Sequence, residues 1–238
     1  MCWGIEATAG MIVVGVAVAG ASAWRGDPVA VPLTVVFFAG MEVLQLAGYM
    51  VIDQCGTPAN EAVTALSMLH IALQPIVINL FLLAWLRPDI SDRDRRRVMI
   101  LASVASVLMV IQMLPWPGLD RCDIGQPLCG ELLCTASGTW HLAWTLPYSD
   151  IFAGPDRWLG TNFGFPAYVL AVFVMPLFYG LWRFVLFHAL VGPIASNLVT
   201  DNPNEAPAIW CLVALLIIGV VLVPGARGLF SARRAAPA

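Results

Sequence analysis

The sequence predicts an all-α, polytopic membrane protein of about seven transmembrane helices, and three observations predict it. Of the 238 residues, 60% are hydrophobic and only 11% are charged, whereas soluble proteins carry roughly 25% charged residues. Apolar segments of about 20 residues, the length that spans a bilayer, recur along the chain. The basic residues, all twelve of them arginine, gather mainly in connecting segments. We expect one transmembrane domain over residues 1–238 in contact with the lipid bilayer. We expect no nucleic-acid partner, because no basic patch is interleaved with aromatic residues.

The apolar segments define the expected spans in order. They cover residues 7–24, 31–52, 60–86, 98–114, 131–152, 165–194 and 208–224. The first is expected to be a retained helix, because residues 1–6 lack the basic start of a signal peptide. A signal cleaved after Ala21-Ser22-Ala23 is the alternative. The fifth includes the polar run 134–139, and a buried span is favoured there over a re-entrant segment.

The placement of the arginines predicts the orientation, because cytoplasmic loops carry an excess of basic residues. With seven spans, ten of the twelve arginines fall on one side of the membrane, five of them in the loop 87–97. Arg121 lies in an outer loop, and Arg183 lies within the sixth expected span. We therefore expect the N-terminus outside and the C-terminus in the cytoplasm, with the protein in the inner (plasma) membrane of the cell.

The six cysteines all fall in outer segments or at outer helix ends of this topology. An even number of cysteines facing an oxidising compartment predicts structural disulfides. Cys55, Cys122, Cys129 and Cys134 are expected to be bonded, joining the loop after the fourth span to the loop after the second. Their pairing stays open. Since no Cys-x-x-Cys motif is present, a thiol–disulfide oxidoreductase is disfavoured.

Four ionisable residues are expected at one depth in the membrane. Counted from the outer span ends at about 1.5 Å per residue, Glu42, His70, His141 and Arg183 each lie about 15 Å in. That is near the middle of a hydrocarbon core roughly 30 Å thick. An uncompensated charge there costs at least about 2.5 kcal/mol. We therefore expect these residues to face one another around a polar cavity.

This set of side chains suits a transition metal. His70, His141 and Glu42 with one open coordination position fit catalytic zinc or iron. The metal would activate water toward an ester or amide of a lipid or other hydrophobic substrate. Arg183 would bind an anionic headgroup or a developing oxyanion, and Tyr49 or Tyr179 would donate a proton. The leading hypothesis is a metal-dependent membrane hydrolase.

Other residues on the same helix faces would support the site. Gln45 lies on the face of Glu42, Gln74 lies one turn after His70, and His188 is a candidate third ligand or gate. The alternative is a structural network in which Glu42 pairs with Arg183 and the glutamines satisfy the histidines. No histidine pair has a diagnostic metal-binding spacing, so both interpretations stay open.

Two further functions use the same residues. His70 and His141 could be axial ligands of a b-type haem lined by the aromatic residues of segment 140–144, which would make the protein an electron carrier linked to quinone. A non-enzymatic transporter or receptor is the third possibility, with the midplane charges lining a path for a substrate or protons.

Several short strings together resemble a family of small, functionally uncharacterised bacterial multi-pass proteins that begin Met-Cys-Trp. The strings are Met1-Cys2-Trp3, Asp53-Gln54-Cys55-Gly56, Leu69-His70-Ile71-Ala72-Leu73-Gln74-Pro75, Trp140-His141-Leu142-Ala143-Trp144 and Asp201-Asn202-Pro203-Asn204-Glu205. The likeness spans nearly the whole chain. It implies the membrane architecture, and no activity or ligand set.

A looser resemblance is to the seven-span hydrolases of the alkaline ceramidase and progestin-receptor-like superfamily. That superfamily uses three histidines, a carboxylate and a serine around zinc, and this chain has three histidines together with Glu42 and Ser67. The paired histidines that the superfamily carries on one late helix are absent here, where His188 stands alone. The resemblance therefore implies a seven-span architecture and not the zinc-binding residues.

Overall fold

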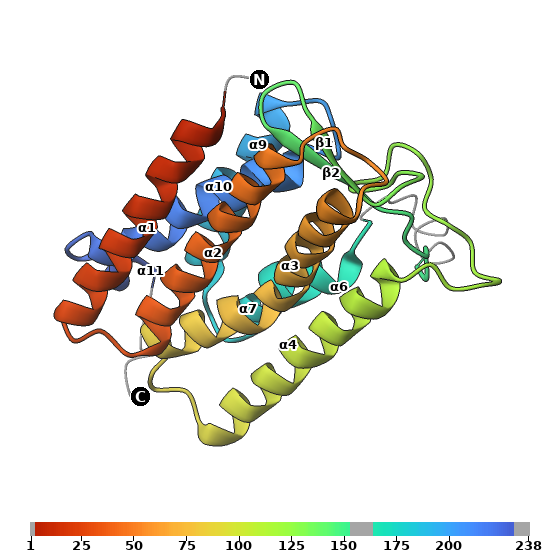
Figure 1. The fold of residues 1–238 in the computed structure, drawn as a ribbon. Coiled ribbons are helices and arrows are strands. Elements are labelled where there is room, and N and C mark those ends of the chain that lie inside the picture. Colours follow the sequence, from red (N-terminus) through yellow and green to blue (C-terminus); the bar gives the residue numbers. More distant parts are fainter. Residues whose placement is uncertain (1–2, 153–163, 231–238) are drawn as a thin grey trace.

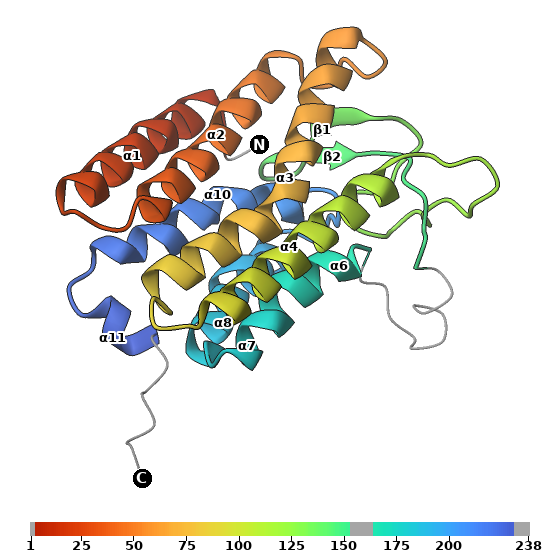
Figure 2. The same cartoon turned by 90° about the horizontal axis from the view of Figure 1, so that it is seen from below.

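In a computed structural model, residues 3–152 and 164–230 are described, and they form a helical bundle capped at one end by a small sheet (Figure 1). The helical elements are α1 (Ile5–Trp24), α2 (Ala30–Met50), α3 (Pro58–Trp85), α4 (Asp92–Met113), α6 (Pro166–Val169), η1 (Leu170–Val174), α7 (Met175–Phe178), α8 (Trp182–Ala189), η2 (Leu190–Ile194), α9 (Ala195–Val199), α10 (Ala206–Gly219), η3 (Val220–Leu222) and α11 (Ala226–Phe230). The strands are β1 (Cys134–Ser137) and β2 (Leu142–Thr145). Seen from below, α3 and α10 lie between α1 and α2 on one side and α4, α7 and α8 on the other (Figure 2).

The helical stretches agree with a membrane protein. Within the described part of the chain, five of them are long and apolar enough to cross a bilayer, namely α1, α2, α3, α4 and the stretch Trp182–Val199. The stretches Pro166–Phe178 and Ala206–Leu222 are apolar but shorter. Helices α1 to α4 coincide with the first four predicted spans.

The prediction of a fifth span over residues 131–152 is wrong. This region contains the antiparallel hairpin β1–β2, in which Cys134 lies opposite Thr145, so the protein is not all-α. The sixth predicted span, over residues 165–194, is two helical stretches that meet at a turn. Gly180 adopts φ +84° at this turn, a left-handed conformation that glycine tolerates and that ends a helix.

Capping residues explain where the long helices begin. The Thr57 side chain accepts a hydrogen bond from the backbone N–H of Asn60 (3.4 Å), and Pro58 occupies the first turn of α3. The Ser91 hydroxyl caps α4 in the same way, and acidic residues follow in the first turn. Within α3, the Asn79 amide donates to the Pro75 carbonyl (2.8 Å) and to a carbonyl of η1.

Small residues bring the first two helices together. The buried positions of α1 are Thr8, Gly15, Ala19 and Ser22, which lie along one face. A Cβ atom placed on Gly15 would lie 2.7 Å from the Cβ of Ala39 in α2. The two backbones therefore approach as closely as small-residue contacts allow in membranes.

The hairpin is attached to the turn between α2 and α3. The Asn60 amide donates to the Thr135 carbonyl (2.8 Å) and accepts from the Thr135 N–H (3.0 Å). The Asp53 carboxylate accepts from the N–H of Ser137 (2.7 Å). A disulfide joins Cys55 to Cys134 at the same place. These contacts hold the hairpin against the end of the helical bundle, in the region where a fifth span was predicted.

The four cysteines expected to be bonded do form disulfides, but the expectation that all six cysteines are paired is not met. Cys122 and Cys129 form a second disulfide within the segment between α4 and β1. Cys211, by contrast, is a free and buried thiol in α10. Cys2 lies outside the described residues.

Arginine side chains tie the chain together at the opposite end of the bundle. Arg25, after α1, donates to the carbonyl of Val221 (3.1 Å), and Arg87, after α3, donates to the carbonyl of Tyr179. Arg183, at the start of α8, donates to a carbonyl of α11 (3.3 Å). The predicted midplane position of Arg183 is therefore wrong, because the break at Gly180 places this residue at a helix end.

Candidate functional site

The structure brings three of the expected site residues together beneath the hairpin. The imidazole of His141 lies between Tyr49 and Gln45 of α2, with 2.5 Å between Nδ1 and the Tyr49 hydroxyl and 3.0 Å between Nε2 and Oε1 of Gln45. The Gln45 amide donates to the carbonyl of Ala208 (3.1 Å), which turns its oxygen toward the imidazole. Nε2 therefore carries the proton, and Nδ1 contacts the Tyr49 hydroxyl, which is also 3.0 Å from the carbonyl oxygen of Trp3. Both ring nitrogens are used within the protein.

A carboxylate directly before α10 holds the backbone around His141. Glu205 is fully buried and accepts hydrogen bonds from the N–H groups of Thr139 (3.1 Å), Trp140 (2.5 Å) and His141, and from the Thr200 hydroxyl (2.6 Å). Burial alone would raise the pKa of Glu205. The hydrogen bonds from Thr200 and from the three backbone amides outweigh burial and lower the pKa below its ordinary value. The Glu205 contacts therefore have a structural role, anchoring the hairpin turn to the start of α10.

Because His141 is buried in the hairpin, we expect the free energy of unfolding to depend on pH. Burial lowers the pKa of His141 to about 4, although the Glu205 carboxylate opposes this shift. The unfolded chain takes up this proton near pH 6.5, so below that pH it binds more protons than the folded protein does. We expect the free energy of unfolding to fall by up to about 1.4 kcal/mol per pH unit as the pH drops from about 6.5 toward about 4. Glu205, whose pKa is lowered, loses its own stabilisation below its ordinary pKa and acts in the same direction.

Thermal unfolding in detergent, followed by tryptophan fluorescence between about pH 7 and about pH 5, measures this dependence. The His141→Gln variant has no imidazole to protonate, so its midpoint should fall less steeply over the same range. Equal slopes for the two proteins would contradict the assignment of this effect to His141.

The remaining predicted residues lie apart from this network. His70 donates through Nε2 to the carbonyl of Phe37 (2.8 Å) and stacks on its ring. Glu42 is fully buried, and neither carboxyl oxygen has a hydrogen-bond partner among the described residues. Arg183 contacts α11, as described above. The expected ring of four ionisable groups is therefore not assembled, and Arg183 does not pair with Glu42.

The donor set for a metal is likewise dispersed. Among residues 3–152 and 164–230, no group of three or more His, Cys, Asp or Glu side chains is placed to hold a metal ion. The structure thus gives no support to the predicted zinc or iron site of His70, His141 and Glu42. The geometry gives no support to a haem held by His70 and His141 either, because both ring nitrogens of His141 are already bonded to Tyr49 and Gln45.

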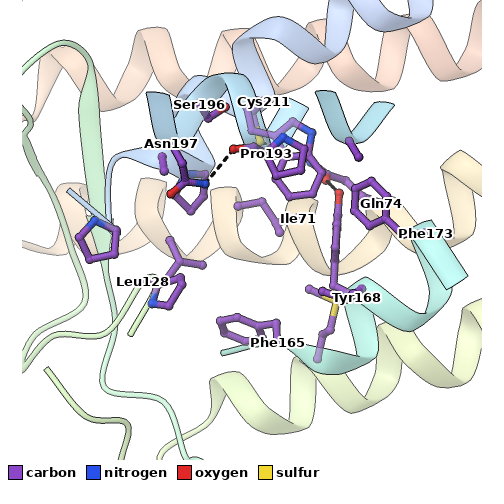
Figure 3. Close-up of a pocket in the computed structure, with 18 of the residues that line it drawn as sticks. Ile71, Gln74, Leu128, Phe165, Tyr168, Phe173, Pro193, Ser196, Asn197 and Cys211 are labelled. Atoms are coloured by element: carbon purple, nitrogen blue, oxygen red, sulfur yellow. Dashed lines mark hydrogen bonds between the residues drawn. The ribbon is translucent and has the colours of Figure 1, made fainter. Parts of the chain in front are cut away.

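A cavity of about 570 Å³ lies on the other side of α3 and α10. Its walls come from α3, α4, the segment before β1, α6, η1, α8, η2, α9 and the start of α10 (Figure 3). Most lining side chains are apolar or aromatic, including Phe165, Phe173 and Trp210. This volume and lining are typical of a pocket for a small hydrophobic molecule.

Gln74 and Tyr168 place polar groups in this largely apolar pocket wall. The hydroxyl of Tyr168 donates to Oε1 of Gln74 (2.7 Å), and the Gln74 amide donates to the Sγ atom of Cys211 (3.5 Å). Figure 3 shows Gln74, Tyr168 and Phe173 on one side of the pocket, with Leu128 and Asn197 on the other. Gln74 therefore belongs to this pocket and not to the network of His141.

The pocket wall contains two π-helical turns. Phe173 lies in η1 and Pro193 lies in η2, and both residues line the cavity. Such turns are rare and are frequent at functional sites, because they re-aim side chains and leave backbone groups less regularly paired. Their presence in the wall of one cavity supports a binding role.

His188 positions an aromatic side chain of the pocket. The indole N–H of Trp210 donates to Nε2 of His188 (3.3 Å), so that nitrogen carries no proton. Gly192 makes room for the same indole, since a Cβ atom there would lie 2.5 Å from Nε1 of Trp210. His188 thus contacts Trp210 and lies apart from the network of Tyr49 and His141.

Sequence reasoning did not identify Tyr168, Phe173, Trp210 and Cys211 as site residues. Tyr168 precedes η1 in the chain, while Trp210 and Cys211 lie on a different helix. The polar pair Gln74 and Tyr168 is separated by 94 residues. The sequence feature that could have indicated this pocket is Gln74, a polar residue in an apolar helix.

The comparisons with known proteins identify a family and no activity. A family model described as a family of unknown function (DUF5765) matches residues 6–231. No curated protein and no solved structure shows a significant match. The expected resemblance to an uncharacterised family agrees with this result, and the likeness to the ceramidase superfamily finds no support.

Proposed function

The chain belongs to the family of unknown function DUF5765, and we propose that it is a plasma-membrane protein that binds a hydrophobic small molecule or lipid in the pocket around Gln74. The observation that carries this proposal is the cavity of about 570 Å³ with its apolar and aromatic walls. Pockets for small ligands usually measure about 300–1,000 Å³ and combine such walls with a few polar groups.

The position of the pocket suits a ligand that comes from the bilayer. Its walls include α3, α4 and the stretch Trp182–Val199, all long and apolar enough to be membrane spans. A hydrophobic molecule partitions into the lipid and reaches such a pocket without crossing water. The binding free energy would come mainly from apolar surface buried against Phe165, Phe173 and Trp210.

The arrangement of the helices supports a seven-pass topology with the N-terminus outside. The passes would be α1, α2, α3, α4, Pro166–Phe178, Trp182–Val199 and Ala206–Leu222, which return the chain to the same side after every second pass. Arg25, Arg87 and Arg183 then join the basic start of α4 at one end, which would be cytoplasmic. Both disulfides and the hairpin lie at the opposite end, which would face the oxidising compartment.

The dispersed donor set favours binding over metal-dependent hydrolysis. A catalytic zinc needs three protein ligands around one position, and His70, His141 and Glu42 are occupied or isolated in separate places. A receptor, a carrier or a transporter for the bound molecule fits the pocket.

Photo-crosslinking of the full-length protein in lipid nanodiscs tests the proposal. The probe is a hexadecanol analogue with a diazirine in its alkyl chain. We expect saturable labelling of the wild-type protein. The Ala189→Trp variant fills the pocket with an indole, because Ala189 lines it, and its saturable labelling should fall by about tenfold or more.

Ala17→Trp is the matched control, because Ala17 is exposed on the first helix and its change leaves the pocket open. Its labelling should equal that of the wild type. If both tryptophan variants are labelled like the wild type, the pocket is not the binding site.

A further inference from the structure

We infer that the pocket selects an uncharged amphiphile whose carbonyl or hydroxyl oxygen accepts a hydrogen bond from the Gln74 amide. This inference rests on the proposed function, which it sharpens by naming the chemical class of the ligand. Two independent features carry it: the absence of charge in the pocket wall and the free hydrogen-bonding capacity of Gln74.

The described pocket wall contains no ionisable carboxylate, guanidinium or imidazole group. Glu42 and His188 are nearby buried groups, but neither lines the cavity. An ionic headgroup that entered the pocket would lose its water and find no opposite charge, which is strongly unfavourable. A hydroxyl or carbonyl group loses far less hydration and needs only one or two hydrogen-bonding partners.

Gln74 supplies such a partner at the polar side of the pocket. Its oxygen accepts from Tyr168, and its nitrogen is 3.5 Å from the Sγ atom of Cys211. A primary amide has two N–H groups, and the contacts of Gln74 with described residues use only one of them. The second N–H is available to an oxygen of the ligand.

The remaining wall fixes the orientation of the ligand. Figure 3 shows Leu128 and Asn197 across the pocket from Gln74 and Tyr168. Asn197 is exposed, with its amide donating to the carbonyl of Pro193 (2.8 Å), whereas Gln74 is buried, and the Leu128 side chain is apolar. The polar group of the ligand is therefore expected beside Gln74, with its hydrocarbon part against Phe165, Leu128 and Ile71.

Competition against the same photo-probe tests the selectivity. The competitors share one alkyl chain and differ in the headgroup: hexadecanol, hexadecyl sulfate and hexadecyltrimethylammonium, compared at equal mole fraction in the nanodisc membrane. We expect hexadecanol to compete at least about tenfold better than either ion. Equal competition by the sulfate or the ammonium compound would overturn the inference while leaving the pocket as a binding site.

The Gln74→Leu variant tests the hydrogen bond. Hexadecanol should lose about fivefold in affinity, the size of one hydrogen bond of about 1 kcal/mol, while hexadecane should bind as it does to the wild type. Gln54→Leu is the matched control, because Gln54 is exposed in the turn after α2. Equal losses for hexadecanol and hexadecane would show that Gln74 only shapes the pocket, and no saturable labelling by any probe would refute the proposed function itself.

Discussion

We expect Glu205→Gln to destabilise the protein by about 3 kcal/mol or more. The carboxylate accepts hydrogen bonds from three consecutive backbone amides, at residues 139–141, and from the Thr200 hydroxyl. A glutamine at this position keeps one acceptor oxygen and places an N–H₂ group against other donors. Buried donors left without an acceptor cost about 1–3 kcal/mol each, and hydrogen bonds to a charged group are stronger than those to a neutral one.

Equilibrium unfolding in mixed micelles of dodecyl maltoside and SDS measures this loss. Glu131→Gln is the matched control, because Glu131 is exposed just before β1 and no hydrogen bond of comparable burial depends on it. The control should unfold within about 0.5 kcal/mol of the wild type. If Glu205→Gln behaved like the control, Glu205 would not be the anchor of the hairpin.

The second large effect is expected from the disulfide between Cys55 and Cys134. It closes a loop with a sequence separation of 79, whereas Cys122 and Cys129 are only 7 apart. In the chain-entropy model, these loops contribute at most about 4.5 and about 2.4 kcal/mol respectively. The longer one also holds β1 against the turn between α2 and α3. The double variant Cys55→Ala/Cys134→Ala should therefore unfold at a clearly lower temperature than the wild type.

The double variant Cys122→Ala/Cys129→Ala serves as the comparison, because it removes a disulfide from the same end of the molecule. Thermal unfolding followed by tryptophan fluorescence ranks the two variants. We expect the larger decrease for Cys55→Ala/Cys134→Ala. The reverse order would mean that loop closure does not dominate the contribution of these disulfides.

The sequence was sufficient to predict the first four helices because their signals are local. Long apolar runs, the caps Thr57 and Ser91 and the arginine-rich turn all lie within short windows. The hairpin resembles a membrane span in sequence because its polar residues, from Cys134 to Tyr148, recur every three or four positions, as on one face of a helix. Its true pattern is two short strands whose stability depends on distant partners, Asn60 and Glu205.

The break within the predicted sixth span was hidden for a related reason. The sequence around Gly180 has no polar loop that would indicate a turn. The turn is stabilised instead by Arg87, which follows another helix and donates to the carbonyl of Tyr179. This break returns the chain across the bundle and places both Phe173 and Pro193 in the wall of one pocket. A continuous helix in its place would not have formed the pocket.

The candidate site was predictable only in part. Tyr49, Gln45 and His141 do meet, although His141 approaches from a hairpin and not from a helix at the same depth. Gln74 stands out in the sequence as a polar residue in an apolar helix, but its partners Tyr168 and Cys211 follow from tertiary packing. Residues on four or more elements form the cavity, and local sequence patterns do not specify such contacts.

Mapping the labelled residues of the wild-type protein by mass spectrometry tests the central claim most directly. After crosslinking with the diazirine analogue of hexadecanol, we expect labels on pocket residues such as Val185, Ala189 and Trp210. Excess hexadecanol should remove these labels. Labels confined to lipid-exposed residues of α1 and α4, such as Val13 and Val107, and unaffected by hexadecanol would contradict a binding pocket in this protein.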